Sequence, residues 1–178
     1  DGILLDDTTL KEKIPFTYKN FEIDCDSIYY RANEFYHLTA KKIHTDKSDL
    51  KIADFRMIPE YDRGEFVRRI PKEKDIYTIN AQEIKINNMN WGFKDSVFYF
   101  NSTNVFLEKV FANIYRPKMP PDDLSKKHLY NKLLRDIKFP LHVDTLAIRE
   151  STLEYEEEKT FEKGAGLLSF NKFNMFVT

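Results

Sequence analysis

The side chains that could support chemistry in this 178-residue chain are four histidines, one cysteine and one acidic run. A zinc site would need two histidines four residues apart on a helix, or a histidine near a cysteine cluster. The histidines show neither spacing; they are His37, His44, His128 and His142. The acidic run at 154–158 lacks the spaced Asp-Asn-Gly order of a calcium loop. We therefore predict no metal site.

Catalytic motifs are absent from the sequence as well. The chain has five glycines and no glycine-rich phosphate loop, no nucleophile elbow and no Ser-His-Asp spacing. Cys25 stands alone, so it forms no internal disulfide. The net charge of −1 gives no basic surface for nucleic acid. We predict a protein that is not an enzyme, with no catalytic residues, no cofactor and no nucleic-acid partner.

One basic cluster interrupts this neutral background, between residues 63 and 74. Glu65, Glu73 and Asp75 alternate with its positive charges, which favours a solvated face. Arginine can also grip phosphate through two parallel hydrogen bonds. Contact with anionic headgroups or with a protein partner is therefore the second interpretation of Arg63, Arg68 and Arg69.

The elements that position these residues are mostly strands. Apolar residues alternate with polar ones, as at Ile84 and Ile86, and this period of two puts one apolar and one polar face on each strand. Turns rich in Asn, Asp, Ser and Gly favour antiparallel meanders. Two segments differ: residues 61–74 predict a short helical turn or loop, and apolar residues at i, i+4 and i+8 predict an amphipathic helix over 121–137.

The strand pattern recurs three times in loose form, over 18–60, 75–118 and 139–178. Such a period favours stacked supersecondary units that share one core. We expect a single β-domain that is one segment of a longer chain, because the sequence opens on Asp1 without a leader.

Three elements in fixed order carry a resemblance to a known family: the segment at 116–120 (RPKMP), the step Phe139-Pro140, and the string at 153–157 (LEYEE) leading to Gly164 and Gly166. From about Tyr18 onward the chain resembles the AsmA-like proteins of Gram-negative envelopes, in particular large members from Bacteroidetes. These are relatives of the TamB-type and eukaryotic bridge-like lipid transfer proteins.

The resemblance implies a mainly β fold, a repeating antiparallel β-groove curled like a taco, with one or two short helices. It implies a periplasmic location, with an inner-membrane anchor helix and further membrane contact outside this segment. The apolar groove would hold phospholipid acyl chains and support lipid transport towards the outer membrane. The expected lining residues carry the alternation of the second and third units; they are Ile84, Ile86, Phe98, Phe100, Leu146, Ile148, Leu153, Tyr155, Leu168 and Phe170.

The same alternation also fits a closed, packed sandwich. In that case the chain would be a structural or protein-interaction domain, such as an envelope assembly scaffold. Its protein partner would bind an edge strand or the helix near Leu129.

Overall fold

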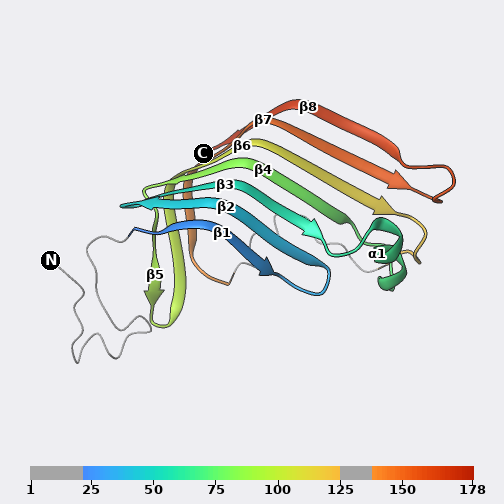
Figure 1. The fold of residues 1–178 in the computed structure, drawn as a ribbon, viewed down its shortest axis with the longest axis horizontal. Coiled ribbons are helices and arrows are strands. Elements are labelled where there is room, and N and C mark those ends of the chain that lie inside the picture. Colours follow the sequence, from blue (N-terminus) through green and yellow to red (C-terminus); the bar gives the residue numbers. More distant parts are fainter. Residues whose placement is uncertain (1–21, 125–137) are drawn as a thin grey trace.

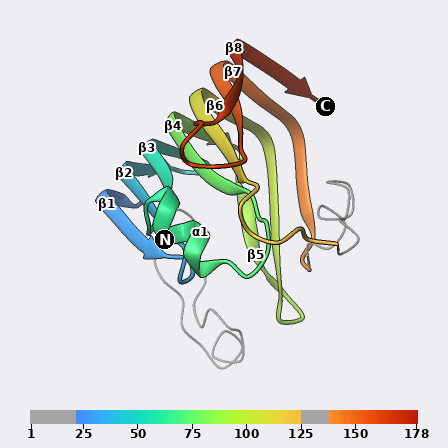
Figure 2. The ribbon, with the colours of Figure 1, turned by 90° about the vertical axis from the view of Figure 1, so that its right-hand side faces the viewer.

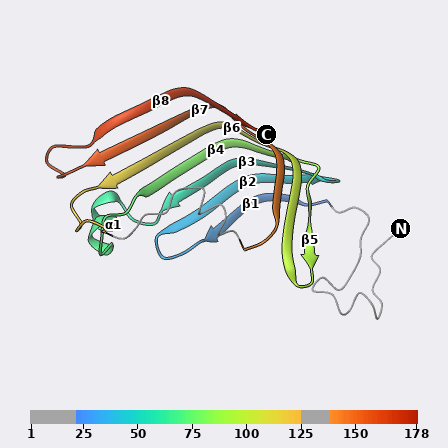
Figure 3. The same cartoon turned by 180° about the vertical axis from the view of Figure 1, so that it is seen from behind.

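The computed structural model describes residues 22–124 and 138–178, and these form one open, curled sheet of eight strands (Figure 1). The strands are β1 (Asp24–Arg31), β2 (Tyr36–Asp46), β3 (Asp49–Pro59), β4 (Ile76–Asn87), β5 (Asn90–Lys94), β6 (Val97–Pro117), β7 (Leu141–Glu158) and β8 (Gly166–Val177). The predicted mainly β class is confirmed, and the sheet is curled without closing (Figures 2 and 3).

The spatial order of the strands is β1-β2-β3-β4-β6-β7-β8, and β5 pairs with β6 as a hairpin. All neighbours are antiparallel except β6 and β7, which are parallel along their length, from Phe100↔Leu141 to Pro117↔Glu158. The expectation of an antiparallel sheet is therefore wrong for this pair. A tight turn can only reverse the chain, whereas the connection over residues 118–140 is long enough to return it to the start of the neighbouring strand.

The short helix expected within 61–74 is α1 (Arg63–Arg69), which lies beside the ends of β3 and β4 (Figures 1 and 2). The Asp62 carboxylate caps it by accepting a 2.8 Å hydrogen bond from the Glu65 amide. Phe66 is fully buried in a cluster of large side chains at this end of the sheet. The other buried members are Tyr36, Ile70, Ile76 and Tyr115.

The other expected helix cannot be followed in full. Residues 121–124 have no regular structure, and 125–137 lie outside the described residues. The segments of the three expected repeats contain β1–β3, β4–β6 and β7–β8, all in one sheet. The repeat boundaries and a repeating groove remain predictions.

A row of unusual backbone conformations crosses the middle of the sheet. One residue in each of five strands has a left-handed φ between 47° and 53°, although none is glycine. These residues are Lys42 on β2, Asp54 on β3, Lys109 on β6, Glu150 on β7 and Lys172 on β8. The register between β2 and β3 and between β7 and β8 shifts at the same places, as it does at β-bulges.

The bulge row reverses the alternation of side chains. On β2, Thr39 and Lys41 are two residues apart and therefore share a face. Their partners on β3, Arg56 and Ala53, are three residues apart. Because paired residues share a face, β3 must change its phase at Asp54. The unbroken registers from β3 through β4 and β6 to β7 carry the change across the sheet. Residues an odd number apart across this row therefore lie on the same face.

Candidate functional site: an uncovered apolar face

Two apolar stripes cross the sheet, one on each side of the bulge row. The first runs over five strands, through the paired residues Leu50 and Ile52, Ile86 and Ile84, Val105 and Leu107, Leu146 and Ile148, and Val177 and Met175. The second crosses seven strands, through Tyr30, Leu38, Met57, Ile79, Ala112, Leu153 and Phe170. A parallel line through Tyr77, Ile114, Tyr155 and Leu168 widens the second stripe.

The two stripes lie on one face because of the bulge row. On β7, Ile148 and Leu153 are five residues apart, with Glu150 between them. Strict alternation would put these two side chains on opposite faces, and the phase change puts them on the same face. The same spacing of five separates Ile84 from Ile79 on β4. The two stripes together are called the apolar face below.

The described elements leave most of the apolar face uncovered, except at the end near α1, where Met57 and Tyr77 pack against the cluster that contains Phe66. Most of its side chains are half-buried by their neighbours in the sheet, while Tyr30, Val177 and Phe170 are 59%, 49% and 47% exposed. The helix α1 lies at the strand ends and reaches both faces. Its Phe66 ring lies 5.8 Å from the ring of Tyr36, which shares a face with Leu38, and its Arg63 binds Glu156 on the opposite face. The described sheet is thus a single layer whose apolar surface is open except at the α1 end.

Eight of the ten expected lining residues belong to the apolar face. Ile84, Ile86, Leu146 and Ile148 lie in the first stripe, and Leu153, Tyr155, Leu168 and Phe170 lie in the second. Phe98 and Phe100 lie on the opposite face, because Phe100 is five residues from Val105 on β6 and no left-handed residue lies between them. Phe98 packs instead against Phe93 and Phe139, with ring centroids 5.6 Å and 5.2 Å away.

The expected lining omits residues of β1–β3 and β6 that the structure adds to the apolar face. Leu50 and Ile52, like Val105 and Leu107, are local i, i+2 pairs that alternation could have identified. Their place opposite Ile84, Ile86 and Ile148 depends on strand order and register, which the local pattern does not contain.

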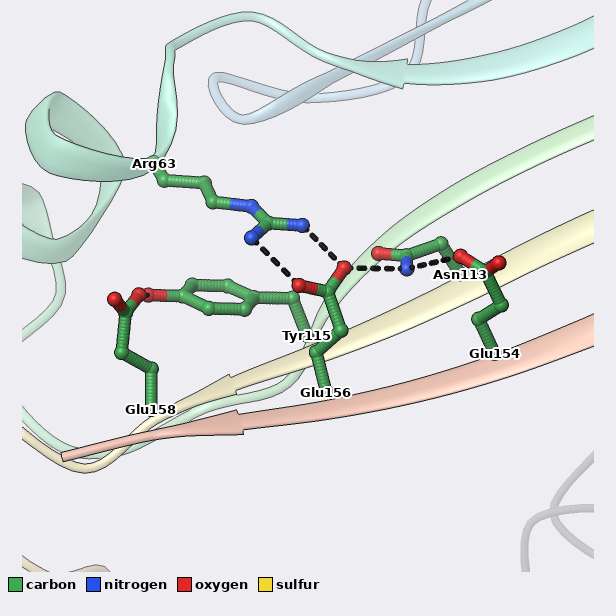
Figure 4. A network of polar contacts seen from close by, with 6 residues as sticks. All are labelled: Arg63, Asn113, Tyr115, Glu154, Glu156 and Glu158. Atoms are coloured by element: carbon green, nitrogen blue, oxygen red, sulfur yellow. Dashed lines mark hydrogen bonds and ion pairs between the residues drawn. The ribbon is translucent and has the colours of Figure 1, made fainter. Parts of the chain in front are cut away.

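The opposite face carries a polar network that attaches α1 to the sheet (Figure 4). Arg63 donates from Nη1 and Nη2 to the two carboxylate oxygens of Glu156 over 2.8 Å and 2.5 Å, and its guanidinium lies 4.1 Å from the Tyr115 ring centroid. The Asn113 amide donates to Glu156 and Glu154 over 2.7 Å and 3.2 Å. These contacts hold the helix against the strands and leave the Arg63 guanidinium engaged.

The charged groups of this network have shifted pKa values. Hydrogen bonding from Arg63, followed by that from Asn113, lowers the pKa of Glu156 against the opposing effect of burial. Burial, reinforced by the hydrogen bond that its hydroxyl donates to Glu158, raises the pKa of Tyr115. The pKa shifts of Glu156 and Tyr115 thus follow from hydrogen bonding and burial within this network.

The other two expected headgroup contacts also have partners within the chain. Arg68 and Arg69 both bind the Glu65 carboxylate, each with an N–O distance of 2.7 Å. The Arg69 guanidinium also lies 4.2 Å from the Tyr61 ring centroid. An anionic ligand would have to compete with these carboxylates for the guanidinium N–H groups. Headgroup or partner contact by the three arginines therefore stays a prediction.

Within residues 22–124 and 138–178, no group of three or more His, Cys, Asp or Glu side chains could hold a metal ion. The helix in this part of the chain is too short and too polar to cross a membrane. No protein-family model, curated protein or solved structure matches the chain.

Proposed function

We propose that this chain binds phospholipid acyl chains on its apolar face, as a non-catalytic segment of an AsmA-like periplasmic protein that supports lipid transport between the inner and outer membranes. The observation that carries the proposal is the union of two apolar stripes on one face of the sheet, most of which no described element covers. The periplasmic location, and an anchor helix outside this segment, rest on the family resemblance.

The dimensions of the apolar face suit an acyl chain. Strands in a sheet lie about 4.8 Å apart, so a stripe across seven strands extends over roughly 29 Å. The hydrocarbon core of a bilayer is about 30 Å thick and contains two leaflets, so one acyl chain spans about half of that length. A chain lying across the strands would therefore stay on apolar side chains throughout.

The energetics favour binding with free movement along the face. Burial of an acyl chain contributes about 0.8 kcal/mol per CH₂ group removed from water. Ile84, Leu107 and Ile148 present similar aliphatic surface on adjacent strands, so an acyl chain can shift from one strand to the next with little change in that energy. The polar headgroup would remain in solvent.

Native mass spectrometry of the purified chain, with a lipid extract of the same sample, tests the proposal. Ile148→Asp places a charge in the first stripe, and Thr145→Asp places the same charge on the opposite face of the same strand. We expect phospholipid with the wild-type chain and with Thr145→Asp, and its loss with Ile148→Asp. Circular dichroism shows whether both variants keep the sheet.

Two results would contradict the lipid proposal. One is a folded wild-type chain that carries no phospholipid and takes up none from vesicles. The other is equal lipid occupancy in the Ile148→Asp and Thr145→Asp variants. Either result would favour the second candidate, a structural or protein-interaction domain. That candidate is supported by the edges of the sheet, since β1 and β8 each pair with one strand among the described residues.

A further inference from the structure

Charged side chains of alternating sign follow the bulge row on six strands, and the uncharged Gln82 occupies the row on β4. In strand order the row consists of Asp26, Lys42, Asp54, Gln82, Lys109, Glu150 and Lys172. Asp26 belongs to the row because it lies opposite Lys42 in the register between Cys25↔Ile43 and Ser27↔Lys41. Members of the row on neighbouring strands are either paired directly or displaced by one residue from direct pairing.

The row ends with opposite charges at the two edges of the sheet. Asp26 on β1 and Lys172 on β8 are both exposed, and neither side chain has an ion-pair or hydrogen-bond partner in the described part of the chain. Every inner member of the row has a neighbour in the row on both sides. A positive charge beside Asp26 at the β1 edge, or a negative charge beside Lys172 at the β8 edge, would therefore continue the alternation.

Strand directions allow the two edges to meet. Every neighbouring pair from β1 to β6 along the sheet is antiparallel, β6 and β7 are parallel, and β7 and β8 are antiparallel. It follows that β8 runs opposite to β1. A second sheet in the same orientation would thus add its β1 to β8 as an antiparallel neighbour, with the backbone hydrogen bonds of that pairing.

We infer that the β8 edge of this chain binds the β1 edge of a second copy, with Lys172 opposite Asp26 of that copy. This register also matches the apolar faces. It sets Phe170 opposite Ile28 and Leu168 opposite Tyr30 on one side of the row. On the other side it sets Phe173 opposite Cys25.

The matching of the apolar faces is an independent check, because the charges alone set the register. A shift by one residue would place Phe170 and Leu168 opposite side chains of the polar face. The contact joins different surfaces of the two copies, so one copy keeps its β1 edge, the other keeps its β8 edge, and a further copy can add at either end. The chain should accordingly form a concentration-dependent series of oligomers. This inference does not rest on lipid binding.

Sedimentation velocity over a range of chain concentrations tests the contact. We expect the wild-type chain to associate, and Lys172→Asp and Asp26→Lys each to remain monomeric, because each variant brings like charges together at the edge. An equimolar mixture of the two variants should associate again, since it restores opposite charges at every contact. Lys163→Asp, which makes the same charge change in the exposed loop before β8, should associate like the wild type.

A cross-linking variant tests the register even where association is weak. Phe173→Cys should form a disulfide with Cys25 of a second copy under mild oxidation. Phe161→Cys, placed in the exposed loop between β7 and β8, should give background levels of cross-linked dimer. A wild-type chain that stays monomeric, together with no excess cross-linking of Phe173→Cys, would overturn the inference. So would association that Lys172→Asp leaves unchanged.

The lipid proposal and this inference can fail separately. Loss of phospholipid from Ile148→Asp with normal association would leave the edge contact intact. A monomeric wild-type chain that retains phospholipid, with no excess cross-linking of Phe173→Cys, would remove the edge contact alone.

Discussion

Ile148 and Leu153 lie five residues apart on β7, yet both side chains are on the same face of the sheet, because Glu150 between them has a φ of 47°. The same change of phase occurs in the other strands at the bulge row. Left-handed residues in five strands, together with the registers that link these strands to β1 and β4, thus convert two apolar stripes that would face opposite directions into a single apolar surface.

The backbone of the bulge row should favour glycine. A left-handed conformation costs a non-glycine residue roughly 1–2 kcal/mol, and glycine adopts it freely. Part of this gain is offset, because glycine loses more conformational entropy on folding than lysine does. We therefore expect Lys109→Gly to raise the free energy of unfolding by up to about 1 kcal/mol. Asn104→Gly, on the same strand with ordinary φ, should lower it by about 0.5–1 kcal/mol. Urea unfolding measures both changes. Equal losses of stability in the two variants would contradict a left-handed conformation at Lys109.

The core at the end of the sheet should depend on Phe66. This side chain is 0% exposed and packs against the Phe35 and Tyr36 rings, with centroids 4.9 Å and 5.8 Å away. Phe66→Ala should lower the free energy of unfolding by about 3–5 kcal/mol through lost burial and the cavity left behind. Phe161→Ala, at a site that is 52% exposed, is the control and should change the urea midpoint little.

The Arg63–Glu156 ion pair should show measurable coupling. Its geometry is bidentate, but the Arg63 side chain is 45% exposed, so solvent weakens the interaction. In a double-mutant cycle with Arg63→Ala and Glu156→Gln, we expect a coupling free energy of about 1 kcal/mol. A coupling near zero, as expected between Arg68 and Glu156, would mean that the pair does not hold α1 to the sheet.

The same pair predicts a pH dependence. Arg63 lowers the pKa of Glu156 in the folded chain below its ordinary value of 4.5. A lowered pKa contributes stability above the unfolded-state pKa, and this contribution is lost as the pH falls through the folded-state pKa. Stability of the wild-type chain should therefore fall below about pH 4.5 more steeply than stability of Arg63→Ala. Parallel curves from urea unfolding at a series of pH values would contradict this assignment.

The buried Tyr115–Glu158 contact should be costly to break. Glu158 is 6% exposed, and it accepts a hydrogen bond from the Tyr115 hydroxyl. Tyr115→Phe keeps the ring under Arg63 but removes the donor, which should cost about 1–3 kcal/mol of unfolding free energy. Tyr99→Phe, whose hydroxyl makes a 3.4 Å contact at an exposed site, provides the comparison and should be nearly neutral. Equal effects in thermal or urea unfolding would argue against a special role for the buried contact.

Local sequence was sufficient for features that depend on neighbours along the chain. The alternation at Ile84 and Ile86 predicted a half-buried strand, and a short helical turn was expected where Asp62 caps α1. The same period of two identified the apolar side chains of each strand, and eight of the ten residues expected as lining lie on the apolar face. Their role in lining a lipid groove stays a prediction. These patterns are local because a side chain's direction is set by the strand that carries it.

The tertiary structure decided which strands meet and which faces combine. The parallel pairing of β6 with β7 depends on the path of residues 118–140, which local turn chemistry does not fix. Lys109 and Glu150 carry no signal for a left-handed backbone, since residues of these types rarely adopt it; the register with their neighbours imposes it. The sequence by itself thus determined which residues form the apolar stripes. The bulge row, which only the tertiary structure reveals, placed both stripes on one face and left Phe98 and Phe100 on the other.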